Sequence, residues 1–487
     1  MRRFHIFAAI VILAFSSCAR SHGNVQEIRE VSDISGLRVA TVSGSLYEIA
    51  LTPREDVKKL VLKNTTDCVE ALQRGMADVF IYDDDIFTAK DLERQGLKIA
   101  CLADYDLPTA FGFSKNNKAL RESFNCFLSG IRADGTLAAM EEFWRNIDDV
   151  SYDEIPKILS FTEGEPLRVG TCIIAAPTSY VKNGEWVGFE VELARRFAAW
   201  VNRPVEIFHY DITSLIFGLQ KDQVDIMMGS ITITEDRQRS VAFSDVYAVK
   251  HPALFVRDSY ARKNNEGLSD HIKDSINHNL IHEGRWHYLT DGLRETLKLS
   301  ILSILLGSLL GMLLCAASFS KRKWMREFVS IYELLMRGLP MLVLLLFMFY
   351  VVFSGAHINA SMVAVIAFSL NFAAGASGVF HSSIESVPKG QTEAGLALGF
   401  SRFATFRYVV LPQAIRKAVP GFKSNCIALI KNTSIVGYIA VRDLTKASDM
   451  IRSRTFDAFV PLLIISIIYL LLAWIIGKLL DLSVKKL

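Results

Sequence analysis

The sequence predicts a two-lobed α/β domain followed by an all-α transmembrane domain of about five helices. In residues 24–256, short β-branched runs alternate with helical stretches, which is typical of parallel α/β sheets. The long apolar runs gather instead in residues 291–487. The chain has 487 residues, which is enough for about three units at ~100–200 residues per domain.

Composition and short motifs exclude several classes of function. The chain carries 54 basic and 51 acidic residues, a net charge of +3, whereas a nucleic-acid-binding protein would show a basic stripe. No nucleic-acid partner is therefore expected. No GxxxxGK[ST] run occurs, so the chain is not expected to be an enzyme that hydrolyses ATP. No CxxC pair or other ligand motif suggests a metal or a cofactor.

The first residues indicate export. Arg2 and Arg3 precede an apolar run over residues 4–15, and small residues follow up to Cys18. This pattern predicts a secretory signal peptide over residues 1–23, because the run is shorter than the ~20 residues of a membrane span. Cys18 after two serines resembles a bacterial lipoprotein processing site, which implies lipidation. An uncleaved anchor with an incidental cysteine is the alternative.

Polar residues stand at the points where several expected strands end. Ligands of parallel sheets bind beyond the carboxyl ends of the strands, so these residues predict a ligand site. They are Ser43, Gly44 and Ser45 after the run 37–42, Asp83 at the end of 77–83, and Ser230 and Thr232 after 224–229.

A resemblance makes this site more specific. Residues 167–247 resemble the first lobe of the solute-binding proteins of polar amino-acid ABC importers, above all in the runs 184–194 and 231–237. Residues 36–146 are similar to the second lobe of the same family, including its returning C-terminal helices. The resemblance implies a two-lobed fold of the type II periplasmic-binding-protein kind and an α-amino-acid ligand.

The two lobes stand in the reverse of the family's order. The simplest interpretation is one circularly permuted binding module, which costs little where native chain ends lie close together. Two degenerate binding domains, each missing half, are the alternative. The expected organisation is 24–146 (second-lobe-like), 147–165 (linker), 166–256 (first-lobe-like), 257–290 (linker) and 291–487 (membrane domain).

The resemblance also implies a role for each site residue. Arg237 aligns with the arginine that grips the ligand carboxylate through its planar guanidinium, and Ser230 and Thr232 would add donors. The amides of residues 43–45 would form an anion-binding nest on the other lobe. Asp83 would take the ligand ammonium, so that a ligand would bridge and close the lobes.

Two of these assignments stay open. Asp84 or Asp85 could replace Asp83, since the three acids are adjacent. The aromatic residue that family members stack on the ligand is missing from its usual place, and Tyr180 or Trp186 is the expected substitute.

Five apolar runs predict membrane spans. Loops rich in Lys and Arg follow the first and third runs, which places these loops in the cytoplasm. The predicted location is the bacterial inner membrane, with the α/β domain on the extracytoplasmic side. The runs are 293–318, 339–355, 360–382, 424–441 and 458–480.

The loop after the third run carries the most specific motif. It resembles the cytoplasmic coupling loop of ABC importer membrane subunits, which implies that it binds an ATPase subunit. An ordinary amphipathic loop helix is the alternative. The motif residues are Glu393, Ala394, Gly395 and Gly399, followed by Leu411 and Pro412.

The two resemblances together favour a fused receptor and permease subunit of an ABC importer for polar amino acids. A separate ATPase would supply the energy, and a second permease subunit, most simply another copy, would complete the pore. The alternative is a ligand-gated receptor, channel or sensor, for which we see no pore-loop filter sequence. A decayed receptor that uses a separate binding protein is a third interpretation.

Overall fold

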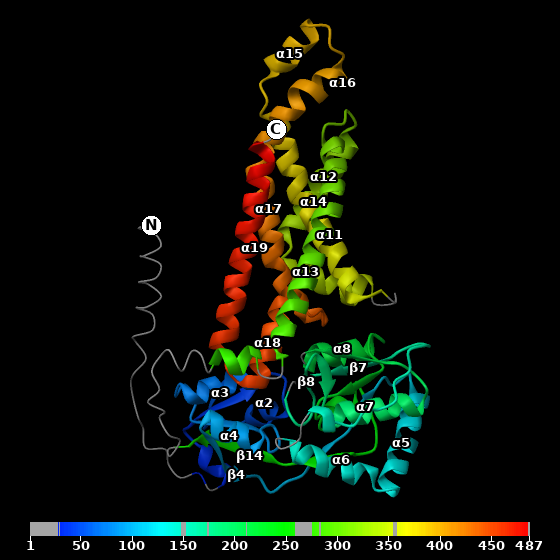
Figure 1. Ribbon diagram of the computed structural model, residues 1–487, viewed down its shortest axis with the longest axis vertical. Helices are drawn as coiled ribbons and strands as arrows, with labels where there is room; N and C mark the ends of the chain where they lie inside the picture. Colours follow the sequence, from blue (N-terminus) through cyan, green and yellow to red (C-terminus); the bar gives the residue numbers. More distant parts are fainter. Residues whose placement is uncertain are drawn as a thin grey trace.

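The computed structural model of this chain describes residue 28 and residues 30–147, 152–172, 175–210, 212–258, 275–281, 284–353 and 358–485. The predicted signal peptide over residues 1–23, with Cys18, lies outside the described residues. Two α/β lobes stand at one end of a long helical bundle (Figure 1). The first lobe is built around strand β1 (Arg38–Val42), and the second lobe is built around strand β7 (Leu167–Thr171).

The first lobe is a five-stranded sheet in the order β2-β1-β3-β14-β4. Strand β1 pairs in parallel with β2 and β3, whereas β14 runs antiparallel to β3 and β4. Val79 and Ile81 enter one apolar cluster and Phe80 enters another, as the alternation of side chains along a strand requires. The elements are β2 (Lys58–Leu62), β3 (Val79–Asp83), β4 (Leu97–Leu102), β14 (Pro252–Arg257), α2 (Leu46–Leu51), α3 (Thr65–Gln73) and α4 (Ala89–Gln95).

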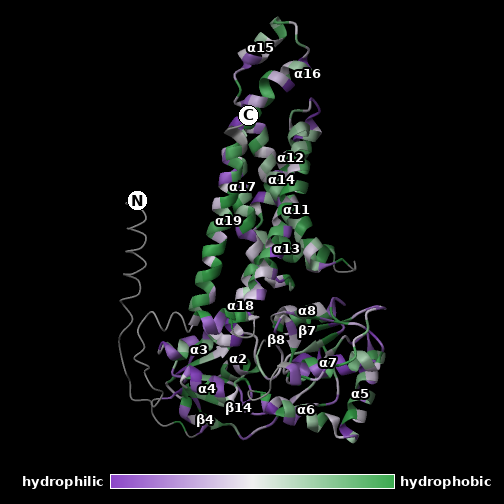
Figure 2. Cartoon of the chain, viewed as in Figure 1, coloured by the Kyte–Doolittle hydropathy of each residue, from purple (hydrophilic) through white to green (hydrophobic). Residues whose placement is uncertain are grey.

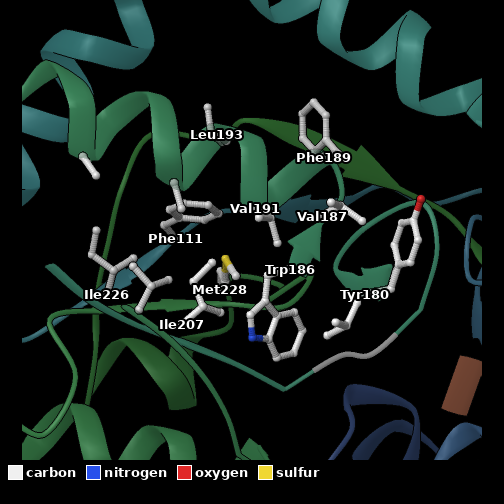
Figure 3. Packing of buried hydrophobic residues seen from close by; sticks show 14 of the residues in the cluster. Phe111, Tyr180, Trp186, Val187, Phe189, Val191, Leu193, Ile207, Ile226 and Met228 are labelled. Atoms are coloured by element: carbon white, nitrogen blue, oxygen red, sulfur yellow. The ribbon is translucent and has the colours of Figure 1, made fainter. Parts of the chain in front are cut away.

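The second lobe is a five-stranded sheet in the order β10-β7-β11-β6-β12. Strand β7 is again parallel to its two neighbours, and β6 runs antiparallel to β11 and β12. Figure 3 shows Phe111 beside Val191, Ile226 and Met228 in the core of this lobe. The elements are β6 (Gly112–Phe113), β10 (Val205–His209), β11 (Ile226–Met228), β12 (Ala242–Phe243), α5 (Lys118–Ala133), α6 (Thr136–Arg145), α7 (Phe189–Trp200) and α8 (Ile212–Gln220).

The two lobes exchange strands. Strand β14 follows the second lobe in the chain but completes the first sheet, and β6 precedes the second lobe but completes the second sheet. Two crossing segments, β5 (Leu107–Thr109) and β13 (Ala248–Lys250), pair antiparallel between the lobes. The ranges 24–146 and 166–256 therefore do not coincide with the lobes, because a sheet is completed by pairing and not by adjacency in the chain.

The bundle carries the apolar surface of the molecule, whereas polar and apolar residues are mixed over the lobes (Figure 2). Among the described residues, three helices are long and apolar enough to span a membrane, and a fourth span results if a bent pair is counted as one. That pair is bent by 104°. The spans are α11 (Trp286–Ser318), α14 (Ala360–Glu385) and α19 (Phe459–Lys485), and the pair is α12 (Lys323–Gly338) with α13 (Met341–Phe347) and its extension to Val352.

The fourth predicted run, 424–441, is not one span. Helix α17 (Leu411–Asn432) packs along α14 and α19, contains Pro420, and ends at Asn432. The chain then forms a 3₁₀ segment (Thr433–Ile439) and helix α18 (Leu444–Thr455). Helix α18 lies at the end of the bundle that faces the lobes (Figure 1). Val436, Ile439 and Val441 of this stretch pack with α11, α13 and α14 in one apolar cluster of the bundle, but they do not continue the α17 helix.

Candidate functional site

One cavity of about 180 Å³ lies where the carboxyl ends of both sheets meet the membrane domain. The ends of β1 and β3 contribute from the first lobe, and the ends of β10 and β11 contribute from the second. Residues of the 3₁₀ segment and of α18 close the cavity from the bundle side. Six predicted site residues line it, namely Ser43, Ser45, Asp83, Ser230, Thr232 and Arg237.

Arg237 supplies a fixed cation on the second lobe. It lies on the short helix α9 (Glu235–Gln238), which begins after Thr234, and the Thr234 hydroxyl accepts a hydrogen bond from the Arg237 amide at 3.2 Å. Its guanidinium Nη1 donates to the Thr232 carbonyl at 3.0 Å. Burial lowers the pKa of Arg237, while nearby groups that include Asp83 raise it. An arginine stays protonated under such a shift, so the cavity keeps a positive charge.

Asp83 supplies the opposite group from the first lobe. It is the last residue of β3, is 6% exposed, and accepts a hydrogen bond from the Tyr47 hydroxyl at 2.5 Å. Burial raises the pKa of Asp83 to about 7, the negative charge of Asp85 adds to this rise, and the Tyr47 hydrogen bond opposes it. The Asp83 carboxyl group therefore titrates near neutral pH.

The structure separates the three adjacent acids. Asp84 pairs with His251 at 3.4 Å, and Asp85 pairs with the partly buried Lys250. Neither lines the cavity, whereas Asp83 does. Asp83 is thus the carboxylate that can meet a ligand, because its neighbours are turned toward partners outside the cavity.

The predicted amide nest is already occupied within the first lobe. The Ser43 amide donates to the Leu62 carbonyl at 2.7 Å, the Gly44 amide to Glu48 Oε2 at 2.6 Å, and the Ser45 amide to the Val42 carbonyl at 3.2 Å. Gly44 itself does not line the cavity. The three amides already donate to a carboxylate and to two carbonyls, so they are not available to an anion. This part of the lobe can offer a ligand the hydroxyl groups of Ser43 and Ser45 instead.

Ser230 behaves in the same way on the second lobe. Its backbone is left-handed (φ +49°), and its amide donates to Oε1 of the buried Glu190 at 2.7 Å. The Tyr247 hydroxyl donates to the same oxygen. Since the amide already has a partner, Ser230 can offer a ligand its side-chain hydroxyl or its carbonyl oxygen in this arrangement, but not its amide.

Tyr180 does not line the cavity, and its expected stacking role is wrong for this structure. It is 1% exposed on strand β8 (Tyr180–Lys182), 6.4 Å from the ring of Trp144. The Arg454 guanidinium lies 5.1 Å from its ring centroid, and Arg442 lies 5.3 Å from that of Trp186 on β9 (Glu185–Val187). Figure 3 shows both rings beside the core of the second lobe. These aromatic rings contact arginines of the membrane domain.

Several lining residues were not predicted from the sequence. His209 follows the rule that pointed to Asp83, because it is the last residue of strand β10, so the same signal could have found it. Tyr82 and Tyr47 carry no such signal. Lys446 and Asp449 come from α18, more than two hundred positions from Arg237. No local pattern connects them with the α/β domain.

The motif that was predicted to be a coupling loop lies at the opposite end of the bundle from the cavity (Figure 1). Glu393, Ala394 and Gly395 lie on α15 (Lys389–Ala397), which packs against α16 (Arg402–Thr405). A Cβ atom on Gly395 would lie 2.5 Å from Thr405 Cγ2, so the two helices require glycine there.

The rest of the motif shapes the chain around α15. Gly399, just after α15, has φ +84°, a conformation that favours glycine. Leu411 and Pro412 begin α17, where proline is tolerated because the first turn needs no intrahelical donor. Two apolar side chains beside the motif face outward, since Leu398 is 78% and Phe403 is 77% exposed.

Comparison with known families matches both parts of the chain. Residues 167–291 match the bacterial extracellular solute-binding proteins, family 3. Residues 303–487 match the binding-protein-dependent transport system inner membrane component.

Individual relatives named as permease proteins match about two fifths of the chain. The chain is 38% identical to the L-cystine transport system permease protein TcyB of Bacillus subtilis, over 42% of this chain and 86% of that protein. It is 34% identical to the arginine ABC transporter permease protein ArtQ of Haemophilus influenzae, over 36% of this chain and 82% of that protein. A crystal structure of an amino acid ABC transporter with histidines aligns with a TM-score of 0.40 and 30% identity, over 46% of this chain and 100% of that chain.

Proposed function

Because this chain belongs to the family of binding-protein-dependent transport system inner membrane components and carries a solute-binding domain of family 3, we propose that it is the fused receptor and permease subunit of an ABC importer for polar amino acids. The observation that carries the substrate class is the cavity. Arg237 and Asp83 line it from opposite lobes. One fixed cation and one carboxyl group are what the carboxylate and ammonium of a free amino acid require. Relatives named for cystine, glutamine and arginine transport support the same class.

We infer that the α/β part is one circularly permuted binding module. The strand exchange supports this. Strand β14 follows the second lobe in the chain but pairs in the first sheet, and β6 precedes the second lobe but pairs in the second sheet. If the two halves were separate domains, the first sheet would lack β14, which joins β3 to β4, and the second sheet would lack β6, which joins β11 to β12. The lobes must therefore fold together, and the cavity between them belongs to a single site.

We further propose that a separate ATPase subunit docks on α15 and α16, and that a second permease subunit, most simply another copy, completes the pore. The exposed side chains of Leu398 and Phe403 supply an apolar contact surface there. The basic turn between α11 and α12 lies at the same end of the bundle (Figure 1). By the positive-inside rule this end is cytoplasmic, which puts the lobes outside.

Asp83 gives this function a pH dependence. The ligand ammonium requires the ionised carboxylate, whose pKa of about 7 lies above its ordinary value of 3.8. Binding should therefore weaken as pH falls below about 7, by about tenfold in dissociation constant per pH unit. Calorimetric titration of the full chain in lipid nanodiscs, from about pH 8 to about pH 6, measures this.

The variant Asp83→Asn is the matched control for this titration. It should bind weakly at every pH and lose the slope. A wild-type affinity that stays constant across the range would contradict the role of Asp83. The same shift acts on stability with a defined sign. Asp83 keeps its proton in the folded chain at a pH where it has lost it in the unfolded chain. Asp83 therefore contributes to the free energy of unfolding at low pH, and this stabilisation is lost as the pH rises from about 4 to about 7.

A further inference from the structure

Helix α18 of the membrane domain contacts both lobes of the binding module. On the first lobe, Arg452 Nη2 pairs with Asp67 Oδ1 at 2.6 Å, and Arg454 Nη1 pairs with Asp91 Oδ2 at 3.6 Å. On the second lobe, the Arg454 guanidinium covers the ring of Tyr180. One short helix therefore holds the module at the two sides of its cleft.

The same helix is fixed to the membrane bundle. The Leu444 amide donates to Thr296 Oγ1 of α11 at 3.1 Å, and the Tyr469 hydroxyl of α19 donates to Asp443 Oδ2 at 3.2 Å. A Cβ atom on Gly292 would lie 2.8 Å from the Asp443 carbonyl oxygen, so α11 and α18 are in close backbone contact. Helix α18 is thus joined to α11 and α19 by direct contacts, so a displacement of α18 would act on these spans.

Helix α18 also forms a wall of the ligand cavity. Lys446, Asp449 and Ser453 line it together with Arg237 and Asp83. Asp449 Oδ1 accepts a hydrogen bond from Arg452 Nη1 at 3.1 Å, and Asp449 Oδ2 lies 3.8 Å from Lys63 Nζ at the cavity side. The lobes alone thus leave one side of the cavity to the membrane domain, and that side is charged.

We propose that the amino-acid site of this chain is composite, and that Lys446 and Asp449 of the membrane domain contact the ligand's side chain and set its preference. The proposal rests on the proposed function, in which Arg237 and Asp83 hold the α-carboxylate and the α-ammonium. The bundle-side wall then meets the rest of the ligand. An anionic Asp449 selects side chains with donors or positive charge, and a cationic Lys446 selects those with acceptors or negative charge. The ligand class is an amino acid with a polar side chain.

The test uses the full chain in lipid nanodiscs and isothermal titration. The probes are L-lysine, L-arginine, L-glutamine, L-cystine and L-glutamate, each titrated into the wild type and into the variants Asp449→Asn and Lys446→Gln. We expect the dissociation constant of the amino acid that the wild type binds most tightly to rise about tenfold in at least one variant. We also expect Asp449→Asn to shift relative affinity toward glutamate and Lys446→Gln to shift it toward lysine.

The variant Asp91→Asn separates ligand contact from docking. It removes a carboxylate that pairs with Arg454 of α18 but does not line the cavity. Because Asp91 does not contact the cavity, this variant should leave every dissociation constant within about twofold of wild type. Thermal unfolding of each variant shows whether the fold is retained.

Three outcomes overturn the proposal, and they are distinguishable. If the wild type binds and both cavity variants keep its affinities and preferences, the composite site is wrong while the proposed function stands. If Asp91→Asn weakens binding as much as the cavity variants do, α18 acts through docking alone. If the well-folded wild type binds none of the probes, the proposed function itself fails.

Discussion

Alanine in place of Arg237 is expected to weaken amino-acid binding by the full chain about a hundredfold, or about 3 kcal/mol. The side chain lines the cavity, is half-buried, and offers a planar donor group that alanine cannot replace. Its loss leaves the ligand carboxylate partly desolvated without a counter-charge. Calorimetric titration in lipid nanodiscs measures the loss.

The same helix provides the matched control. Arg239 lies two residues further on, its side chain is 78% exposed, and it does not line the cavity. Arg239→Ala removes a charge of the same kind from the residue that caps α9, and this variant should bind within about twofold of wild type. Equal affinities for Arg237→Ala and wild type would show that the carboxylate is held elsewhere.

Glutamate at both Leu398 and Phe403 is expected to abolish ATP-driven uptake while leaving ligand binding intact. These two side chains project from the coupling-loop region, at the opposite end of the molecule from the cavity. Burying two carboxylates in an apolar contact is unfavourable, so the ATPase subunit should dissociate. We expect at least a tenfold fall in uptake of labelled amino acid, about the size of a hot-spot loss.

Leu159→Glu is the control for added surface charge, since Leu159 is 72% exposed outside the bundle. It should keep both uptake and co-purification of the ATPase with the tagged chain. If the Leu398 and Phe403 double variant still retains the ATPase, the docking surface lies elsewhere on the membrane domain.

The parts of the site that sequence could predict are those set by the local chain. Asp83 ends a buried strand and Arg237 follows a threonine cap, and both features are encoded within a few residues. The same holds for Gly399, whose left-handed backbone explains its place in the motif. These local patterns do not show that the two lobes share one cavity, because two separate sites, one in each lobe, would fit them equally well.

What escaped prediction depends on contacts between distant residues. The amide nest fails because Glu48 takes the Gly44 amide, and Tyr180 faces Arg454 although 274 positions separate them in the chain. The run 424–441 resembled a span because its composition is apolar, but its second part leaves the helix and packs against other helices of the bundle. An apolar run predicts that its residues are buried, but the tertiary structure decides whether lipid or other parts of the protein bury them.

The most direct test of the central claim is calorimetric titration of the wild-type full chain, in lipid nanodiscs and without any added binding protein, against the common amino acids. The account predicts that a polar amino acid binds with one ligand per chain, because the lobes form one cavity with Arg237 and Asp83 on opposite sides. A well-folded chain that binds no amino acid would contradict the account. The receptor would then have to be a separate protein.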